Sequence, residues 1–323
     1  MRYQNILRCA LSLGLYAVVT ATYAAPYPDR PITVVVPQAA GGASDVVSRI
    51  VLQKIGSILN QSIVVENRPG AGGNIGISAV ARAPADGYTL LFNVSSAHLI
   101  NPYLYSEPGF SPERDFAPVS PFGTGSMLLV AAPDFPPNNI QELLALAKAK
   151  PNEITYASAG NGTLNHLMGE VFNKSAKVEM MHVPYRGAAA ATTDVMSGRV
   201  SVAFQAVASS ISQVKAGKLK VLAIASTKRL PDLPGVPTIG ESIPGYGEDP
   251  WYGLFAPAKT PVDVLDKLSQ ATQKALEDEG VRRSLAAQGV EPYFLSRAEF
   301  AKLIGTELPR WENIVKDSGA KVD

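Results

Sequence analysis

Ile32-Thr-Val-Val-Val-Pro37 is a run of mainly β-branched residues that leads straight into the turn Gln38-Ala-Ala-Gly-Gly-Ala-Ser-Asp45. Its apolar residues are consecutive rather than alternating, as expected of a parallel strand that is buried on both faces. Residues 46–59 then place apolar side chains at helical spacing. This strand, turn and helix predict an α/β fold.

The same order of elements repeats along the chain. Strands at residues 63–66 and 89–92, with a helix between them, extend the first unit to βαβαβ with a parallel sheet. A second series of strands and helices runs from residue 127 to residue 224. The chain then returns through a strand at residues 251–255, amphipathic helices and a further strand at residues 292–295.

These two series predict two lobes, each a mainly parallel sheet flanked by helices. We expect lobe 2 to be inserted into lobe 1, because the last helices need a sheet to cover. The predicted bounds are 25–125 plus 251–323 for lobe 1 and 126–250 for lobe 2, with a Pro- and Gly-rich hinge or linker at 230–250. Two lobes joined by more than one crossing form a hinge with a cleft between them.

Composition excludes several classes of protein. The chain has 323 residues, of which 46% are hydrophobic, with 29 Lys and Arg against 28 Asp and Glu. These values rule out a disordered, coiled-coil or collagen-like chain. The charge balance also argues against nucleic-acid binding, which normally requires a basic excess.

Residues 1–24 are predicted to be a secretory signal peptide. A positively charged start precedes a short apolar run, and Thr22 and Ala24 occupy positions −3 and −1 of a cleavage site. The alternative is a retained anchor helix, although the run is short for a membrane span. Cys9, the single cysteine, would leave with the leader. We therefore expect an exported protein without disulfides and without direct membrane insertion.

Small and polar residues follow the strands where helices begin. Turns rich in Gly, Ser, Asn and Thr occupy residues 37–45, 67–74, 93–98 and 158–163. Ligands of open α/β sheets bind at the carboxyl ends of strands, and helix N-termini there offer N–H donors to an anion. Plain helix capping explains any single turn equally well, but four turns at one edge favour an anion pocket. A carboxylate is favoured over a phosphate, because the sequence has no P-loop.

Signals of catalysis are absent from the sequence. It has no Gly-x-Ser-x-Gly elbow, and its three His residues lack metal-ligand spacing. We therefore expect no metal and no cofactor. His98 and His166 follow strand-end turns and either line the cleft or play a structural part, while His182, within a predicted strand, is expected to be structural. Tyr185 either faces the ligand or caps the next helix, and Trp251 and Tyr252 either wall the cleft or pack in the hinge.

An ordered set of motifs resembles the Bug receptors, the substrate-binding proteins of tripartite tricarboxylate transporters. The motifs are Tyr27-Pro-Asp-Arg-Pro-Ile-Thr-Val-Val-Val-Pro37 with Gly41-Gly42 and Asp45, Glu66-Asn-Arg-Pro-Gly-Ala-Gly-Gly73, Asp86-Gly-Tyr88, Tyr156-Ala-Ser-Ala-Gly-Asn-Gly-Thr163 with His166, His182-Val-Pro-Tyr-Arg-Gly187, Ala216-Gly-Lys-Leu219, Leu233-Pro-Gly-Val-Pro-Thr238 and Trp251-Tyr-Gly-Leu-Phe-Ala-Pro257. Together they span essentially the whole chain that follows the leader.

The resemblance implies a periplasmic-binding-protein-like fold and a receptor that works as a monomer in the periplasm. Such receptors close two lobes on a small carboxylate and deliver it to membrane permease subunits. In the family, the loops that match residues 37–45 and 158–163 grip the carboxylate through backbone N–H groups and bridging waters. Ser95 and His98 match a third loop, whose side chains vary with the ligand.

The chain departs from the family pattern in two places. Many members carry aromatic and Pro residues where this sequence has Gln38-Ala39-Ala40, and the smaller side chains would widen the pocket. Many members also carry Asp at the position of Gln205, so a charge to pair with an ammonium is missing. We therefore expect a ligand without an amino group, either a di- or tricarboxylate or an aromatic acid.

These inferences give a set of candidate ligand-binding residues. The set is Gln38, Gly42, Ala43, Ser44, Asp45, Ser95, His98, Ser158, Gly160, Asn161, Gly162, Thr163, His166, Tyr185 and Gln205. Two alternatives to a transport receptor stay open. One is a sensor that presents its closed form to a sensor kinase, and the other is a periplasmic hydrolase, for which the sequence shows no nucleophile–base pair.

Overall fold

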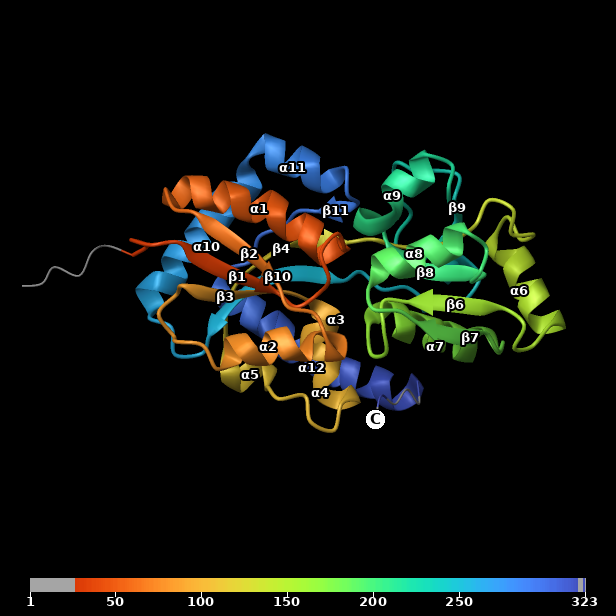
Figure 1. The fold of residues 1–323 in the computed structure, drawn as a ribbon, viewed down its shortest axis with the longest axis horizontal. Coiled ribbons are helices and arrows are strands. Elements are labelled where there is room, and N and C mark those ends of the chain that lie inside the picture. Colours follow the sequence, from red (N-terminus) through yellow and green to blue (C-terminus); the bar gives the residue numbers. More distant parts are fainter. Residues whose placement is uncertain (1–26, 319–321, 323) are drawn as a thin grey trace, which may run out of the picture.

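The fold is described from a computed structural model, which places residues 27–318 and residue 322. The predicted signal peptide at residues 1–24 lies outside the described residues. The described chain forms two lobes, each built around one sheet (Figure 1). Lobe 1 has a six-stranded sheet and lobe 2 a five-stranded sheet, which confirms the two-lobed α/β class.

The sheet of lobe 1 has the order β11-β4-β10-β3-β1-β2. Its strands are β1 (Ile32–Val36), β2 (Ile63–Asn67), β3 (Thr89–Val94), β4 (Phe116–Gly125), β10 (Trp251–Pro257) and β11 (Val290–Glu291). Strand β1 pairs in parallel with β2 and β3. Its valines fill the cores on both faces of the sheet, because Val34 and Val35 point into different hydrophobic clusters. The run of consecutive apolar residues is thereby explained.

Helices cover both faces of the lobe 1 sheet. On one face, apolar side chains of α1 and α10 pack with Val34, and on the other, those of α2 and α12 pack with Val35. The helices of this lobe are α1 (Ala43–Leu59), α2 (Asn74–Ala81), α3 (Ser95–Leu99), α4 (Asn101–Leu104), α5 (Pro112–Asp115), α10 (Val262–Glu277), α11 (Glu279–Ala286) and α12 (Arg297–Ser318), with a 3₁₀ turn η1 (Ala71–Gly73). No helix in residues 27–318 has the length and apolar character that a membrane span requires.

Lobe 2 is made from the chain between β4 and β10. Its sheet has the order β7-β6-β8-β5-β9. The strands are β5 (Met127–Ala131), β6 (Thr155–Ser158), β7 (Met181–Pro184), β8 (Val202–Ala206) and β9 (Lys220–Ile224). The helices are α6 (Ile140–Ala149), α7 (Leu164–Ala176), α8 (Ala188–Met196) and α9 (Val207–Lys215), with a 3₁₀ turn η2 (Ile239–Glu241).

Both sheets are mixed, where the sequence pattern predicted mainly parallel sheets. Strand β10 runs antiparallel to β3 and β4, and β5 runs antiparallel to β8 and β9. The physical reason is that the chain crosses between the lobes at these strands. Strand β5 enters lobe 2 from lobe 1 and β10 returns, so neither follows the right-handed crossover that makes neighbouring strands parallel.

Two segments differ from their predicted structure. The strand predicted at residues 292–295 is absent, and the short β11 precedes it, because Pro292 has no N–H to continue the ladder. The predicted linker at residues 230–250 is packed rather than open. Its residues Ile239, Ile243 and Tyr246 are buried in the core that α7 also joins.

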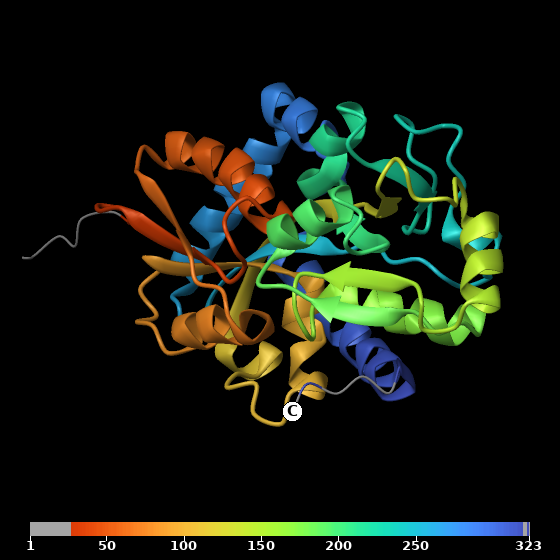
Figure 2. The same cartoon turned by 45° about the vertical axis from the view of Figure 1, so that its right-hand side comes forward.

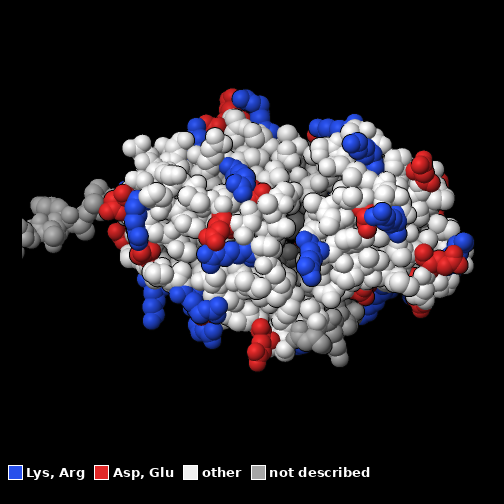
Figure 3. All heavy atoms as spheres, in the orientation of Figure 1, with Lys and Arg blue, Asp and Glu red and all other residues white. Residues whose placement is uncertain are grey.

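A crevice separates the two lobes on the surface, with basic side chains beside it (Figure 3). The lobes nevertheless touch at its rim. The Oη of Tyr105 in lobe 1 lies 3.2 Å from the carbonyl oxygen of Asn161 in lobe 2. A Cβ atom added to Gly187 of lobe 2 would lie only 3.2 Å from Cβ of Ala39 in lobe 1. The structure is therefore a closed arrangement of the lobes.

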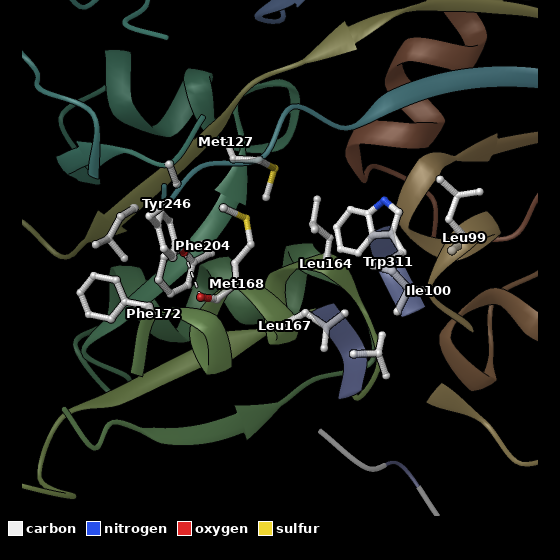
Figure 4. Packing of buried hydrophobic residues seen from close by; sticks show 14 of the residues in the cluster. Leu99, Ile100, Met127, Leu164, Leu167, Met168, Phe172, Phe204, Tyr246 and Trp311 are labelled. Atoms are coloured by element: carbon white, nitrogen blue, oxygen red, sulfur yellow. Dashed lines mark hydrogen bonds between the residues drawn. The ribbon is translucent and has the colours of Figure 1, made fainter. Parts of the chain in front are cut away.

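Helix α12 runs from lobe 1 to the helices of lobe 2, as the dark blue ribbon of the turned view shows (Figure 2). Trp311 of α12 lies between Leu164 and Leu167 of lobe 2 and Leu99 and Ile100 of lobe 1 (Figure 4). These residues belong to one hydrophobic cluster that crosses from lobe to lobe. The hinge region thus has a continuous apolar core.

Candidate ligand-binding site

A cavity of about 660 Å³ lies between the two lobes. Lobe 1 contributes the loops after β1, β2 and β3, and lobe 2 contributes the loops after β6, β7 and β8. Tyr252 of β10 and Met127 of β5 add walls where the chain crosses between the lobes. The cavity therefore occupies the carboxyl ends of the parallel strands, the place where α/β sheets bind ligands.

Five helices of eight or more residues begin at this cavity. Their N-cap residues all line it, namely Gly42 (α1), Gly73 (α2), Thr163 (α7), Gly187 (α8) and Ala206 (α9). None of these five N-caps supplies a side-chain hydrogen bond to its helix. The first-turn N–H groups and the positive ends of the helix dipoles therefore face a common space.

Two helices that begin elsewhere, α6 and α11, are capped by side chains, whereas α10 begins after Pro261 without such a cap. The side chain of Asn139 accepts a hydrogen bond from Glu142 N at the start of α6, and Asp278 does the same for Val281 N at the start of α11. The five helices at the cavity have no cap of the kind seen in α6 and α11. An anion placed there would satisfy donors that the protein leaves without a side-chain partner.

The charge of the cavity wall comes from one residue. Arg186 is the single charged residue that lines the cavity in the described part of the chain. It is exposed and adjoins Gly187 at the start of α8. Because no carboxylate of residues 27–318 lines the same wall, this part of the site favours an anionic ligand and offers no partner to an ammonium group.

Asp45 lies beside the cavity but is used within its own loop. Its carboxylate accepts hydrogen bonds from Gly41 N (2.9 Å), Arg49 Nε (2.9 Å) and Asn67 Nδ2 (3.1 Å). Burial would raise the pKa of Asp45, but these hydrogen bonds and the Arg49 charge outweigh it, so the pKa is lowered. Asp45 therefore holds the loop after β1 in shape and is not part of the cavity wall.

The turn after β6 is built from glycines and internal hydrogen bonds. Gly160 and Gly162 have φ of +131° and +78°, which other residues adopt only with strain. Thr163 Oγ1 donates to Gly160 O (2.7 Å), and Ser158 Oγ accepts from Gly160 N (3.1 Å). From outside the cavity, His166 Nδ1 accepts from Gly162 N (3.2 Å).

The sequence matches the family model of the tripartite tricarboxylate transporter family receptor over residues 47–320. The chain belongs to this receptor family. Membership agrees with the cavity between two lobes, since these proteins are solute-binding receptors.

Solved structures of relatives have the same fold. The periplasmic binding protein BugD is 35% identical, with a TM-score of 0.87 over 91% of this chain and 99% of its own. An R. palustris protein with adipate is 32% identical, with a TM-score of 0.88 over 92% and 100%. MatC from Rhodopseudomonas palustris, with bound malate, is 32% identical, with a TM-score of 0.84 over 90% and 100%.

The structure brings most of the candidate residues of the receptor together. The candidates in the cavity wall are Gln38, Gly42, Ala43, Ser44, Gly160, Asn161, Gly162, Thr163 and Tyr185. The candidates outside the wall are Asp45, Ser95, His98, Ser158, His166 and Gln205. The second group supports the loops or belongs to the core.

His98 belongs to the core of lobe 1, which corrects its prediction as a ligand contact. Its ring is fully buried and stacks on Phe255 with centroids 4.1 Å apart. Burial lowers the pKa of His98 to about 3, so the ring is neutral near pH 7. The position after a strand-end turn suggested the cleft, but the side chain points into the aromatic core.

Gln205 is likewise absent from the cavity wall. Its side chain is fully buried, and neither amide atom has a hydrogen-bond partner within the described residues. Ala206, the next residue of β8, lines the cavity instead. The alternation of side chains along a strand separates the two, because adjacent residues point to opposite faces.

Some residues of the wall were missed by sequence reasoning. These are Ser96, Tyr105, Asn165, Arg186 and Ser209. Arg186 stands within the motif Tyr185-Arg186-Gly187 and follows a strand, so its position could have been found. Asn165 and Ser209 lie inside helices, and no local signal distinguishes them from ordinary helix residues.

The structure also places a Ser–His pair near the site. Ser158 Oγ and His182 Nε2 are 2.6 Å apart, which sequence separation alone did not suggest. Ser158 is fully buried and does not line the cavity. A hydroxyl in that position cannot attack a substrate held in the cavity, so the pair does not support a hydrolase.

Proposed function

We propose that the receptor captures a small carboxylate in this cavity by closing its two lobes. The observation that carries the proposal is the set of five uncapped helix N-termini that share one cavity. Backbone N–H groups and helix dipoles favour an anion there. The relatives with adipate and malate support the proposal, because both of those ligands are carboxylates.

The charge of the wall narrows the ligand class. Arg186 gives the wall a positive charge, and no acidic side chain lines it among the described residues. An amino acid would bring an ammonium group without a partner, which costs free energy. We therefore propose a ligand without an amino group, a di- or tricarboxylate or an aromatic acid. The neutral Gln205 near the site is consistent with this choice.

Ligand contacts in both lobes would favour the closed state. A ligand shifts a hinge equilibrium by as much as it prefers one state over the other. Here the walls from lobe 1 and lobe 2 meet around one cavity, so the full set of donors is assembled only when the lobes are closed. The rim contact between Tyr105 and Asn161 belongs to that state.

The predicted leader and the family support a place of action in the periplasm. We propose that residues 1–24 direct export and are then removed. Lobe 1 (25–125 plus 251–323) and lobe 2 (126–250) form the mature receptor. This receptor works in the periplasm as a monomer. The closed form would deliver its carboxylate to membrane permease subunits. A sensor that presents the closed form to a kinase is the alternative, and uptake of labelled ligand by cells lacking the gene would distinguish the two.

The experiment is a thermal-shift screen of residues 25–323 at pH 7.5. The panel contains adipate, malate, citrate, benzoate, aspartate and glutamate. A ligand that binds only the native state adds about 2.7 kcal/mol of stability at a hundredfold excess over Kd. We expect a clear shift with at least one non-amino carboxylate and none with the two amino acids. No shift with any member of the panel would refute the proposal.

A further inference from the structure

Two histidine rings stack on each other at the side of the turn after β6 that faces away from the cavity. His166 is in the first turn of α7 and His182 is in β7, and their rings stack with centroids 4.2 Å apart and planes 24° from parallel. His166 is only 6% exposed, and neither ring lines the cavity. The pair contacts the turn from outside, while Gly160, Asn161 and Gly162 line the cavity.

The hydrogen bond to Gly162 fixes the protonation of His166. Gly162 N–H donates to His166 Nδ1 at 3.2 Å, so Nδ1 carries no hydrogen. The ring proton of the neutral form is therefore on Nε2, which lies 3.8 Å from Glu170 Oε1. A second proton would have to enter at Nδ1, where the Gly162 N–H already points. Two donors would then face each other, and the turn would lose this contact.

His182 does not carry the same conflict. Its Nε2 lies 2.6 Å from Ser158 Oγ, and a hydroxyl can accept or donate. A protonated His182 can therefore keep its contact with Ser158. Of the two rings, only His166 must be neutral to hold the turn.

The groups that face His166 come from three elements. Glu170 lies one turn further along α7, Tyr156 of β6 donates a hydrogen bond to that Glu170 carboxylate, and His182 of β7 covers the ring. Tyr246 packs nearby through its hydrogen bond to Met168 O. Helix α12 meets α7 through the apolar contact of Trp311 with Leu164 and Leu167 (Figure 4).

These surroundings keep the ring neutral near pH 7. Burial lowers the pKa of His166, and the Glu170 carboxylate acts against this shift. Burial, and then the neighbouring His166, lower the pKa of His182 to about 4. Both rings therefore become charged only in acid.

We propose that neutral His166 is a positioning residue for the carboxylate-binding turn, and that protonation of this one ring lowers ligand affinity. The inference rests on the proposed function, because it assigns a pH dependence to the same site. The direction in which affinity changes with pH distinguishes this effect from simple charge attraction. A positive charge near an anion would by itself raise affinity in acid, whereas loss of the Gly162 contact lowers it.

The matched variant is H166N. The Oδ1 of Asn takes the place of Nδ1 as an acceptor for Gly162 N–H, and it does not titrate. H166A removes the acceptor at every pH. Thermal unfolding of each variant at pH 7.5 verifies that it is folded. Selective labelling with ¹⁵N-glycine reports the amide signals of Gly160 and Gly162 without any ligand.

The first measurement is a pH titration of these amide signals between pH 4 and 8 in the free protein. We expect the Gly162 signal of the wild type to shift with the titration of a single His, and that of H166N to stay unchanged over the same range. An unchanged Gly162 signal in the wild type, or an equal shift in H166N, would overturn the proposal whether or not any carboxylate binds.

The second measurement is the Kd for adipate over the same pH range. The ratio of the wild-type Kd to the H166N Kd cancels the ionisation of adipate itself. We expect the ratio to be constant near pH 7 and to rise by up to about tenfold per pH unit below the pKa of His166. A ratio that stays constant or falls in acid contradicts the effect on affinity. If no panel carboxylate binds at pH 7.5, the proposed function is wrong. The amide titration still tests the role of His166 in that case, because it needs no ligand.

Discussion

Tyr105 Oη of lobe 1 donates a hydrogen bond of 3.2 Å to the carbonyl oxygen of Asn161 in lobe 2. The bond spans the rim of the cavity, and both residues also line it. Any opening of the lobes must break this contact. It therefore adds to the stability of the closed state relative to the open state.

The variant Y105F tests this contact. A single hydrogen bond contributes about 0.5–1.5 kcal/mol, so we expect ligand affinity to fall about two- to tenfold, mainly through faster dissociation. Stopped-flow dissociation of the best ligand of the screen measures the effect. Y103F is the control, because Tyr103 is exposed on α4 and does not line the cavity. Equal dissociation rates for Y105F and the wild type would contradict the prediction.

Arg186 is expected to set the preference for doubly charged ligands. In R186Q the wall has no charged residue among those described. We expect the Kd for adipate to rise about tenfold or more and that for a monocarboxylate of equal length to rise less, since only the former offers a second carboxylate to the guanidinium. Calorimetry with adipate and hexanoate measures the difference. K218Q, an exposed change outside the cavity wall, is the control, and equal losses for the two ligands would disprove a role in selectivity.

Trp311 is expected to be the main apolar link between the lobes. Its side chain is 2% exposed and contacts residues of both lobes. Truncation of a buried Trp to Ala costs about 3–5 kcal/mol, so W311A should lower the free energy of unfolding by that amount. Urea unfolding followed by circular dichroism measures it. K316A, on the exposed side of the same helix, serves as the reference, and a loss under about 1 kcal/mol would rule out this role.

His98 should make the receptor sensitive to acid. Its folded-state pKa of about 3 lies below the ordinary value of 6.5, so the unfolded chain binds the proton first. The stability from the neutral ring is complete above pH 6.5 and is lost as pH falls toward 3. At pH 5 the loss from His98 is about 2 kcal/mol.

Denaturant unfolding at pH 7.5 and pH 5 tests this expectation. H98L has no group to titrate at that position, so its stability should fall less between the two pH values than that of the wild type. Each protein is compared with itself at pH 7.5, which removes the packing cost of the substitution. An identical decline in both proteins would show that other groups cause the acid sensitivity.

The elements that sequence reasoning predicted best were those with a strong local pattern. The valines from Val34 to Val36 indicated a buried strand, and the Gly-rich turns at 37–45 and 158–163 indicated helix N-termini at the sheet edge. Both patterns depend on neighbours in the chain, and the structure has both.

Features set by distant parts of the chain were not predicted. Strand β4 contains Pro118 and Pro121, and its apolar and polar residues alternate little. The sequence of this segment therefore gives no local indication that it pairs with β10. The direction in which a side chain points also escaped prediction. His98 and Gln205 occupy expected places along the chain, yet the aromatic core and the strand alternation turn their side chains away from the cavity.

The five helix ends at the cavity have a consequence for how this receptor can change over generations. The donors that they present belong to the main chain, so they are inherited with the fold and survive the replacement of most side chains. Recognition of the carboxylate group would then persist while residues such as Gln38, Ser96 and Arg186 drift. A lineage could exchange one acid for another by altering these few side chains, without rebuilding the part of the site that holds the charge.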